Sequence, residues 1–395
     1  MSEIGSLAFQ EHSMAARVTF FPVGNGDMTL ITLGDSSQVT LLIDCNLTED
    51  PTALTQLRRL VQRDERGRPY VDAFLLTHPD QDHCRGIAKY FYLGDPGLYP
   101  DDEKPADEKR IFIRELWSSP MVFRRASADH VLCEDAKALN EEARRRVSES
   151  KRRNFLVSAG DRILILGEDE DGKTADLQPL VIQTGAVFSR INGADNPCFA
   201  ARLLAPMPKS DSPLLEETWG KNHSSVVLQL SLRPSPGAAV GCRFLTGGDA
   251  EVAIWEMLWD TYGDTPEALT YDLLLSPHHC SWHSLSYDSW SEKRERGAVA
   301  SKARAALSQI RSKGFIVASS KPIHDDDNDP PCFGAKRVYA GIAEVVGGRF
   351  MCTGDTSGKP LEFSITARGL EILDRAAKTA AAVSSLSTPI KPWGY

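Results

Sequence analysis

The stretch that decides the fold is Thr77-His78-Pro79-Asp80-Gln81-Asp82-His83. It places two imidazoles and two carboxylates within a single short loop. The preceding run, 71–76, is short and apolar and is expected to be a buried strand, and 84–92 is expected to be a short helix. Open α/β folds carry their chemistry at the carboxyl ends of strands, where this loop would lie. Charged groups this close desolvate one another at a cost unless a cation holds them, so the stretch predicts a metal site.

The composition indicates a globular enzyme-sized chain without a broad basic surface. The 395 residues are 42% hydrophobic and 25% charged, with a net charge of -9, which argues against extended electrostatic binding of nucleic acid. A nucleic-acid substrate stays open, because bound metals reverse the local sign of charge. No apolar run is long enough to span a membrane, and residues 1–5 do not begin a signal peptide. Eight scattered cysteines without a C-x-x-C pair predict reduced thiols and a cytoplasmic location.

Apolar runs of strand length, separated by turns, recur along the chain. We expect strands at 18–23, 28–33, 39–43, 71–76, 111–117, 162–167, 226–232, 243–246, 271–276 and 315–319. We expect helices at 52–63, 84–92, 128–153, 250–259 and 300–312. The tight turns among the first three strands predict a mostly antiparallel N-terminal sheet. Residues 192–213, with four prolines, are expected to be irregular.

A basic run in the third expected helix has two interpretations. It comprises Arg144-Arg145-Arg146 and Lys151-Arg152-Arg153. A track for substrate phosphates is one interpretation. A solvated helix face balanced by Glu141, Glu142 and Glu149 is the other, and we favour it because charge runs usually face solvent.

Several expected strands end in a residue that can bind a metal. These are Asp44, His78, Asp249, His278 and His279. Each alone has an ordinary explanation; an aspartate after Thr246-Gly247-Gly248 is commonly a helix N-cap, for example. Strand ends at one edge of a sheet meet in space, however, so their shared position predicts a single site that also includes the 78–83 stretch.

The motifs, taken in order, resemble a known family. His78-x-Asp80-x-Asp82-His83 is similar to the H-x-[HD]-x-D-H signature of the metallo-β-lactamase fold, and the carboxylate at its third position resembles the branch found in ComEC-type competence proteins. Further segments are similar to that branch: 21–27, 42–44, 222–228, 245–249 and 277–281. The resemblance spans about residues 18–370, without the membrane channel of that family. It implies an α/β (α+β) fold, the αββα sandwich, with mixed sheets and helices on the outer faces.

By matching positions, the resemblance implies two divalent metal ions. His78 and Asp80 would bind the first, with His223 as a third ligand, while Asp82, His83 and His279 would bind the second and Asp249 would bridge both. Catalytic roles would fall to Asp82, Asp249 and His278, the last as proton donor to the leaving group or substrate contact. Asp27 and Asp44 would orient ligating histidines, and His283 and His324 would line the mouth. Asp80 in place of histidine shifts the preference from Zn²⁺ toward Mn²⁺ or Mg²⁺.

The resemblance favours a phosphodiesterase or nuclease acting on DNA, through a hydroxide activated between the metals. Two alternatives stay open: hydrolysis of a small ester, lactone or nucleotide at the same site, and a metal-stabilised binding or effector subunit that needs a protein partner from the same system. We expect one hydrolase domain at 17–372 with an insert at about 94–155, flanked by a flexible N-terminus, 1–16, and a tail, 373–395.

Three positions depart from the family pattern. Cys45 and Cys280 stand where glycine is usual, and Gly248 is an additional residue before Asp249. Because cysteine normally adopts negative φ, we expect these turns to be shaped differently. Cys45, Cys84 and Cys280 could act as ligands or redox groups, but we favour packing, since free cysteine is commonly a small buried hydrophobe.

Overall fold

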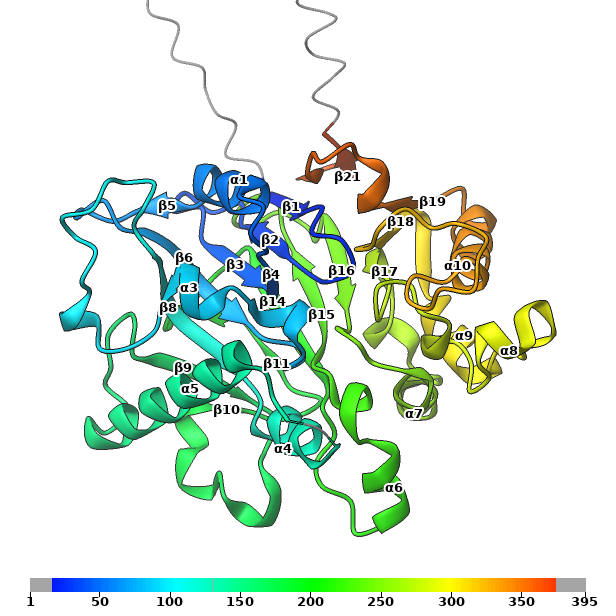
Figure 1. Ribbon diagram of the computed structural model, residues 1–395, viewed down its shortest axis with the longest axis horizontal. Helices are drawn as coiled ribbons and strands as arrows, with labels where there is room; N and C mark the ends of the chain where they lie inside the picture. Colours follow the sequence, from blue (N-terminus) through cyan, green and yellow to red (C-terminus); the bar gives the residue numbers. More distant parts are fainter. Residues whose placement is uncertain (1–15, 130, 374–395) are drawn as a thin grey trace, which may run out of the picture.

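Two β-sheets stacked face to face form the centre of the molecule, and helices cover the outer surface of each sheet (Figure 1). The computed structural model describes residues 16–129 and 131–373. Helices α1, α3 and α5 lie against one sheet, and α7, α9 and α10 lie against the other. This is the αββα sandwich with mixed sheets that the sequence predicts. Within the described residues, no helix is long and apolar enough to cross a membrane.

The first sheet runs in the order β10-β9-β8-β6-β3-β2-β1-β20-β21, with β5 on β6 and β7 on β8. Strands β1, β2 and β3 pair antiparallel, as predicted, while β3, β6, β8 and β9 are parallel neighbours. The bounds are β1 (Ala16–Phe20), β2 (Thr29–Thr32), β3 (Thr40–Ile43), β5 (Gln62–Arg63), β6 (Pro69–Leu75), β7 (Phe91–Tyr92), β8 (Ile111–Ser118), β9 (Arg162–Leu166), β10 (Val181–Ile182), β20 (Leu361–Thr366) and β21 (Gly369–Ile372).

The second sheet runs in the order β11-β14-β15-β16-β17-β18-β19. Its first four strands pair antiparallel, and β16 to β19 are parallel. The bounds are β11 (Val187–Phe188), β14 (Phe199–Ala205), β15 (Val227–Leu232), β16 (Cys242–Thr246), β17 (Tyr271–Leu275), β18 (Ile310–Ala318) and β19 (Arg349–Cys352). Outside both sheets lie β4 (Cys45–Asn46) and the pair β12 (Arg190–Ile191) and β13 (Ala194–Asp195).

The helices that cover the sheets lie on the outer faces because they present an apolar side to a sheet. The α-helices are α1 (Thr52–Leu60), α2 (Gln81–Cys84), α3 (Ile87–Tyr90), α4 (Pro120–Asp129), α5 (Glu134–Arg152), α6 (Pro213–Thr218), α7 (Val252–Tyr262), α8 (Trp290–Lys293), α9 (Ser301–Leu307) and α10 (Phe333–Val345). The 3₁₀ helices are η1 (Pro96–Leu98), η2 (Glu170–Gly172), η3 (Ala175–Leu180), η4 (Lys221–Ser224), η5 (Pro266–Ala268), η6 (Trp282–Ser284), η7 (Arg294–Arg296) and η8 (Thr353–Asp355).

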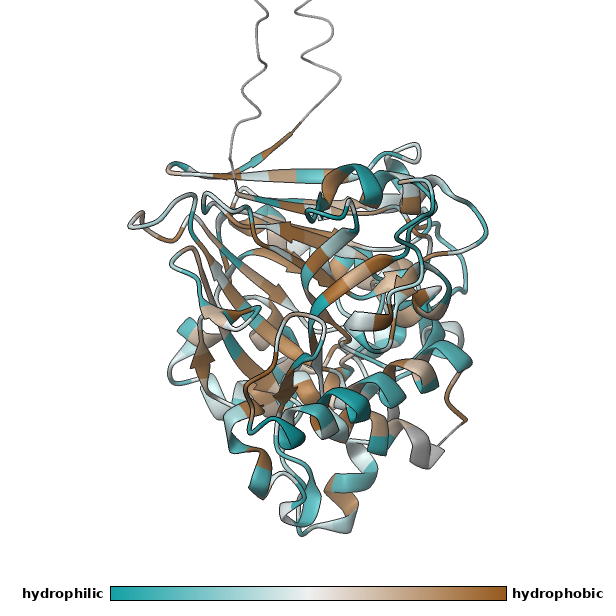
Figure 2. Ribbon diagram, turned by 90° about the vertical axis from the view of Figure 1, so that its left-hand side faces the viewer, coloured by the Kyte–Doolittle hydropathy of each residue, from teal (hydrophilic) through white to brown (hydrophobic). Residues whose placement is uncertain are grey.

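Side chains from both sheets meet in a central apolar core. Phe20 contacts the rings of Phe244, from the second sheet, and Phe363 edge to face, with centroids 5.8 and 6.0 Å apart. Figure 2 shows the hydrophobic strands in the interior and the more polar helices outside. Each sheet also packs against its own helices through a further apolar core. Because both faces of each sheet are buried, most strands have continuous apolar sequences.

Several expectations about elements are wrong, among them the helix 52–63, which ends at Leu60 before β5 begins at Gln62. The predicted helix 84–92 is helical only at α3, because Cys84 ends α2, Gly86 has a φ of 83° and residues 91–92 form β7. The predicted helix 128–153 is interrupted, because Cys133 caps a new helix, α5. Residues 199–205, expected to be irregular, form β14. The predicted helix 300–312 ends at Leu307, and Ile310 already begins β18.

The expected insert, 94–155, supplies β8 to the middle of the first sheet and α5 to its outer face. The domain's expected start at 17 falls one residue into β1, and its expected end at 372 coincides with the end of β21. The predictions of a flexible N-terminus and of a C-terminal tail fall almost wholly on residues 1–15 and 374–395, which lie outside the described residues.

Candidate metal centre

The 78–83 loop is fixed to both sheets at their shared edge. Strand β6 ends at Leu75, and the next residue, Leu76, donates its N–H to the carbonyl of Trp117 in the neighbouring strand β8 at 3.2 Å. The carbonyl of Thr77 accepts from the N–H of Val226, just before β15 in the second sheet, at 2.9 Å. The start of the loop therefore connects the two layers, and its second half forms α2, whose single turn holds Asp82 and His83.

His83 lies between two carboxylates from different parts of the chain. Its Nδ1 is 2.8 Å from Oδ2 of Asp44, which follows β3, and its Nε2 is 2.9 Å from Oδ1 of Asp249, which follows β16. Asp44 is held in turn by the N–H of Thr77 at 2.7 Å and by the Thr77 hydroxyl. Asp44 therefore fixes the ring of His83 so that Nε2 faces the centre of the cluster.

His279 is arranged in the same manner from the second sheet. Its Nδ1 is 3.3 Å from Oδ1 of Asp27, in the turn before β2. Its Nε2 is 3.2 Å from Oδ2 of Asp82 and 3.5 Å from Oδ1 of Asp249. Donor atoms of Asp82, His83 and His279 lie within 4.8 Å of one another, close enough for one ion. Asp44 contacts Nδ1 of His83 and Asp27 contacts Nδ1 of His279, the ring nitrogens that face away from this group.

A second group of donors lies at the start of the loop. His78 is fully buried, and its Nε2 is 3.2 Å from Oδ2 of Asp80. The rings of His78 and His83 are 5.7 Å apart, nearly perpendicular to one another. The predicted third ligand, His223, belongs to η4, but its side chain lies outside the described residues.

His278 is presented by a left-handed turn. His278, His279 and Cys280 have φ values of 50°, 51° and 71°, a conformation that L-residues seldom adopt in succession. Nε2 of His278 is 3.6 Å from Oδ2 of Asp249, and its Nδ1 is 3.5 Å from Oε1 of Glu251. The turn thus directs two adjacent imidazoles to opposite sides of Asp249.

Two neighbours of His278 were missed by the sequence analysis. Asn222 donates through Nδ2 to Oε1 of Glu251 at 3.0 Å, and the same Nδ2 is 3.5 Å from Nε2 of His278. Glu251, rather than Asp249, occupies the N-cap position of α7. The sequence signal for Glu251 was its position two residues after Asp249, at the start of a helix.

We use the name strand-end cluster for the converging side chains of Asp27, Asp44, His78, Asp80, Asp82, His83, Asp249 and His279. Several buried atoms in it form no hydrogen bond of regular geometry among the described residues, although most of them lie at ion-pair distance from one another. They are Oδ1 of Asp27, both ring nitrogens of His78, Nε2 of His83, Oδ1 of Asp249 and both ring nitrogens of His279. Buried polar atoms are almost always hydrogen-bonded, so imidazoles and carboxylates that converge here without regular hydrogen bonds indicate a place for a cation between them. Imidazole nitrogens and carboxylate oxygens together fit a divalent cation.

The charges in the cluster lead to the same conclusion. Burial would lower the pKa of His279, but the carboxylates of Asp249 and Asp27 outweigh it and raise that pKa to about 10. Likewise, Asp249 and Asp44 overcome the effect of burial and raise the pKa of His83 well above its usual range. Burial would raise the pKa of Asp249, but the surrounding imidazoles hold it well below its usual range. The carboxylates thus draw positive charge into the cluster.

His283 and His324, predicted to line the mouth, are not brought into the cluster. The side chain of His283 is 42% exposed, and its Nε2 is 3.9 Å from Oδ2 of Asp329. His324 is exposed on the loop after β18. Both lie at the surface, and their role at the mouth stays a prediction.

The cysteine turns differ from expectation at one position. Cys280 adopts the positive φ that we expected a cysteine to avoid, so the turn keeps its left-handed shape without glycine. Cys45 instead lies in β4, and the preceding Asp44 takes the positive φ of 55°. Cys45, Cys84 and Cys280 are buried free thiols.

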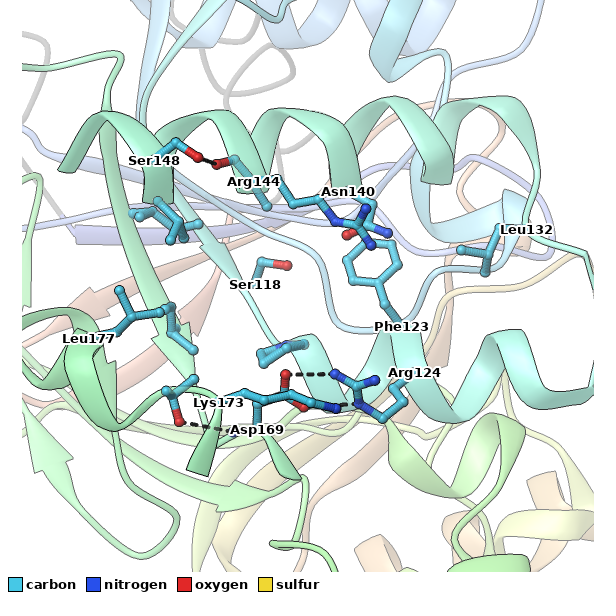
Figure 3. A pocket seen from close by; sticks show the side chains of 16 residues that line it. Ser118, Phe123, Arg124, Leu132, Asn140, Arg144, Ser148, Asp169, Lys173 and Leu177 are labelled. Atoms are coloured by element: carbon cyan, nitrogen blue, oxygen red, sulfur yellow. Dashed lines mark hydrogen bonds and ion pairs between the residues drawn. The ribbon is translucent and has the colours of Figure 1, made fainter. Parts of the chain in front are cut away.

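A cavity of about 680 Å³ lies apart from the cluster, between α4, α5 and the outer face of the first sheet (Figure 3). Arg144 and Asn140 point into it from α5, and the Arg124–Asp169 ion pair closes its other side. No side chain of the strand-end cluster lines this cavity. The cavity and the strand-end cluster are therefore separate places in the molecule.

Comparisons with known proteins assign no family. No family model matches the chain, and no curated protein sequence matches it. Among solved structures, unliganded yeast PDE1 matches with a TM-score of 0.39 and 12% sequence identity, over 86% of this chain and 97% of that chain. A likeness of this extent assigns no activity, and the proposal below rests on the geometry of the strand-end cluster.

Proposed function

We propose that this chain is a metal-dependent hydrolase of phosphodiester bonds, with DNA as its substrate class, and that it belongs to the ComEC-like branch of the metallo-β-lactamase fold. The observation that carries the proposal is the convergence of buried imidazole and carboxylate atoms without regular hydrogen bonds at the ends of strands from both sheets. Such a cluster contributes little to stability as it stands, since buried polar groups without regular hydrogen bonds are destabilising. It is consistent with a site built for cations and for chemistry.

Two ions are proposed, held by residues of both halves of the chain. The first would be held by His78, Asp80 and His223, the second by Asp82, His83 and His279, with Asp249 bridging them. When bound, such a pair activates water as a nucleophile and polarises the phosphate oxygens. The carboxylate of Asp80 makes the first position rich in oxygen, which favours Mn²⁺ or Mg²⁺ over Zn²⁺ there.

The surrounding aspartates orient the ligands. Asp44 accepts from Nδ1 of His83 and Asp27 faces Nδ1 of His279, so that both rings present Nε2 to the centre. Carboxylates in this position fix the tautomer of a ligating histidine and increase its basicity. Their removal would weaken metal binding without removing a ligand.

His278 is placed to act on the leaving group. It is only 14% exposed, and carboxylates flank both of its ring nitrogens. A ring in this setting can hold a proton at Nε2 and transfer it to the departing oxygen of the substrate. Glu251 would hold the ring in place by accepting from Nδ1, and Asn222 would hold Glu251 by donating to the same Oε1.

One observation favours the smaller-substrate alternative. In the basic run of α5, Arg145 and Arg146 pair with Glu142, and Arg152 and Arg153 pair with Glu149, which supports the solvated-face interpretation over a phosphate track. A long polymer would therefore find few phosphate contacts on this helix. A short single strand, a nucleotide or a small ester would fit equally well, and the assay must distinguish them.

The test combines metal analysis with a substrate panel. Purified protein is analysed for metal content and then assayed with single-stranded DNA, duplex DNA, RNA and bis(p-nitrophenyl) phosphate, with Mn²⁺, Mg²⁺ or Zn²⁺ added. We expect metal-dependent cleavage of DNA and of the small diester. Cleavage of the small diester alone would favour the small-substrate hydrolase. Bound metal without turnover of any substrate, together with unfolding of Asp80→Ala, would overturn the proposal in favour of a metal-stabilised binding subunit.

A further inference from the structure

Two thiols face each other behind the metal-binding loop. Sγ of Cys84, at the end of α2, is 3.6 Å from Sγ of Cys133, at the start of α5. Both are free cysteines, and they are separated by 49 positions in sequence. At this distance the two sulfur atoms are in direct contact, with room for one thiol hydrogen between them.

The two sulfurs differ in access and in their surroundings. Cys84 is fully buried and its Sγ contacts the carbonyl oxygen of Asp80 at 3.2 Å. Cys133 is partly exposed and occupies the N-cap of α5, where its Sγ accepts from the N–H of Ala136 at 3.4 Å. A helix N-terminus stabilises a thiolate.

We propose that Cys133 and Cys84 form an oxidation site for hydroperoxides, in which Cys133 is attacked first and Cys84 closes a disulfide. A reactive, accessible thiolate beside a buried second thiol is the arrangement that gives reversible oxidation. The neighbouring chain favours closure, because residues 131–133 lie between two helices and belong to neither. The sulfurs must approach to about 2.05 Å, a movement of the order of a side-chain rotation.

The reaction balances with one hydroperoxide per disulfide. The thiolate of Cys133 attacks one peroxide oxygen, the O–O bond breaks, and hydroxide (or alkoxide) leaves; Cys133 becomes a sulfenic acid. The thiol of Cys84 then loses its proton as its sulfur attacks the sulfur of Cys133, the S–O bond breaks, and water leaves. The peroxide has taken two electrons from the two sulfurs, and a dithiol returns them by exchange.

The test is peptide mapping of the full chain after brief treatment with hydrogen peroxide, followed by alkylation and tryptic digestion without reductant. Trypsin should release residues 67–85 and 126–137, each with one cysteine. We expect these two peptides to be joined, with the mass of two hydrogens lost, and to separate on treatment with dithiothreitol. Other cysteine pairs joined at equal yield, or no joined pair while Cys133 stays reduced, would overturn the proposal.

Matched variants separate the two roles. Cys133→Ser keeps a good N-cap for α5, and we expect it to consume peroxide at least tenfold more slowly. Cys84→Ala should leave Cys133 reactive but unable to close the bond, so that dimedone labels residue 133. Cys242→Ala, at a buried cysteine in β16, is the control and should behave as the unmodified protein. Peroxide consumption by Cys133→Ser at the unmodified rate would show that another residue reacts first. These readouts do not depend on hydrolytic activity.

Discussion

Two buried charged clusters, one beneath α5 on the first sheet and one at the edge shared by both sheets, differ in how completely their members pair with one another. In the α5 ion cluster, comprising Glu142, Arg145, Arg146 and Asp161, each charge has a partner of opposite sign. Arg146 is 1% exposed, and its guanidinium also donates to the carbonyls of Arg162 and Ile113 at 3.0 and 3.1 Å. In the strand-end cluster, by contrast, carboxylates outnumber the imidazoles, and several buried atoms have ion-pair contacts but no regular hydrogen bond.

The difference separates a structural role from a functional one. A buried ion pair with its hydrogen bonds complete holds α5 to β8 and β9 and needs nothing more. A cluster of buried imidazoles and carboxylates that lacks regular hydrogen bonds costs folding free energy until a cation binds there. Four predictions, ordered by expected effect, test whether this contrast holds.

The largest effect is expected from Asp249→Ala. This change removes the carboxylate that lies between His83 and His279 and would bridge both ions. We expect metal content to fall and diester hydrolysis to drop by about 10³-fold or more, in keeping with the several kcal/mol that metal ions supply to such reactions. Metal analysis and steady-state kinetics provide the measurement. Asp264→Ala, at an exposed aspartate, is the matched control, and a fully active Asp249→Ala protein would contradict the dinuclear site.

In the α5 ion cluster the expected loss is of stability instead. Glu142→Ala leaves two arginines, one of them buried, without their shared partner. Removing one member of a buried ion pair typically costs about 3–5 kcal/mol. Denaturant unfolding should show this decrease, while the metal content per folded molecule stays unchanged. Replacement of the pair in Glu142→Leu/Arg146→Met should cost less, because it leaves no buried charge of that pair; an equal or greater loss would contradict the ion-pair explanation.

Metal addition should distinguish the clusters within one experiment. A ligand at 100 times its Kd stabilises the folded state by about 2.7 kcal/mol. We expect Mn²⁺ to raise the free energy of unfolding by this amount in the unmodified protein and in Glu142→Ala, but not in Asp249→Ala. Chelation should reverse the gain. If all three proteins gained equally, the metal would be bound outside the strand-end cluster.

The sequence revealed the half of the candidate site that is local. The ligands at 78–83 follow one strand and share one loop, so their spacing alone predicts a metal site. Asp249 and His279 follow other strands, and their position at strand ends was sufficient to predict convergence. Glu251 and Asn222 could not be found in this way, because their contact with His278 depends on a left-handed turn that contains no glycine.

The predicted element boundaries are wrong where tertiary contacts override the local preference of the sequence. Residues 128–153 have a continuous helical pattern, yet Cys133 begins a new helix whose start packs against Cys84. Residues 199–205 were expected to be irregular because prolines flank them, but pairing with β15 makes them a strand. Both outcomes depend on neighbours that are distant in sequence, which a local pattern does not contain.

The smallest effect is expected at Gly248, which positions Asp249. Its φ is 48°, and an added Cβ would lie 2.5 Å from Oγ1 of Thr77, whose hydroxyl and N–H hold Asp44. Gly347 also has positive φ, at 67°, but has open space around it. Gly347→Ala should therefore cost only the left-handed conformation, about 1–2 kcal/mol. Gly248→Ala should cost about 1 kcal/mol more from the steric conflict and should also weaken Mn²⁺ binding, which titration would detect. Equal stability losses with equal Mn²⁺ affinity would mean that the Thr77–Asp44 contact does not position the ligands.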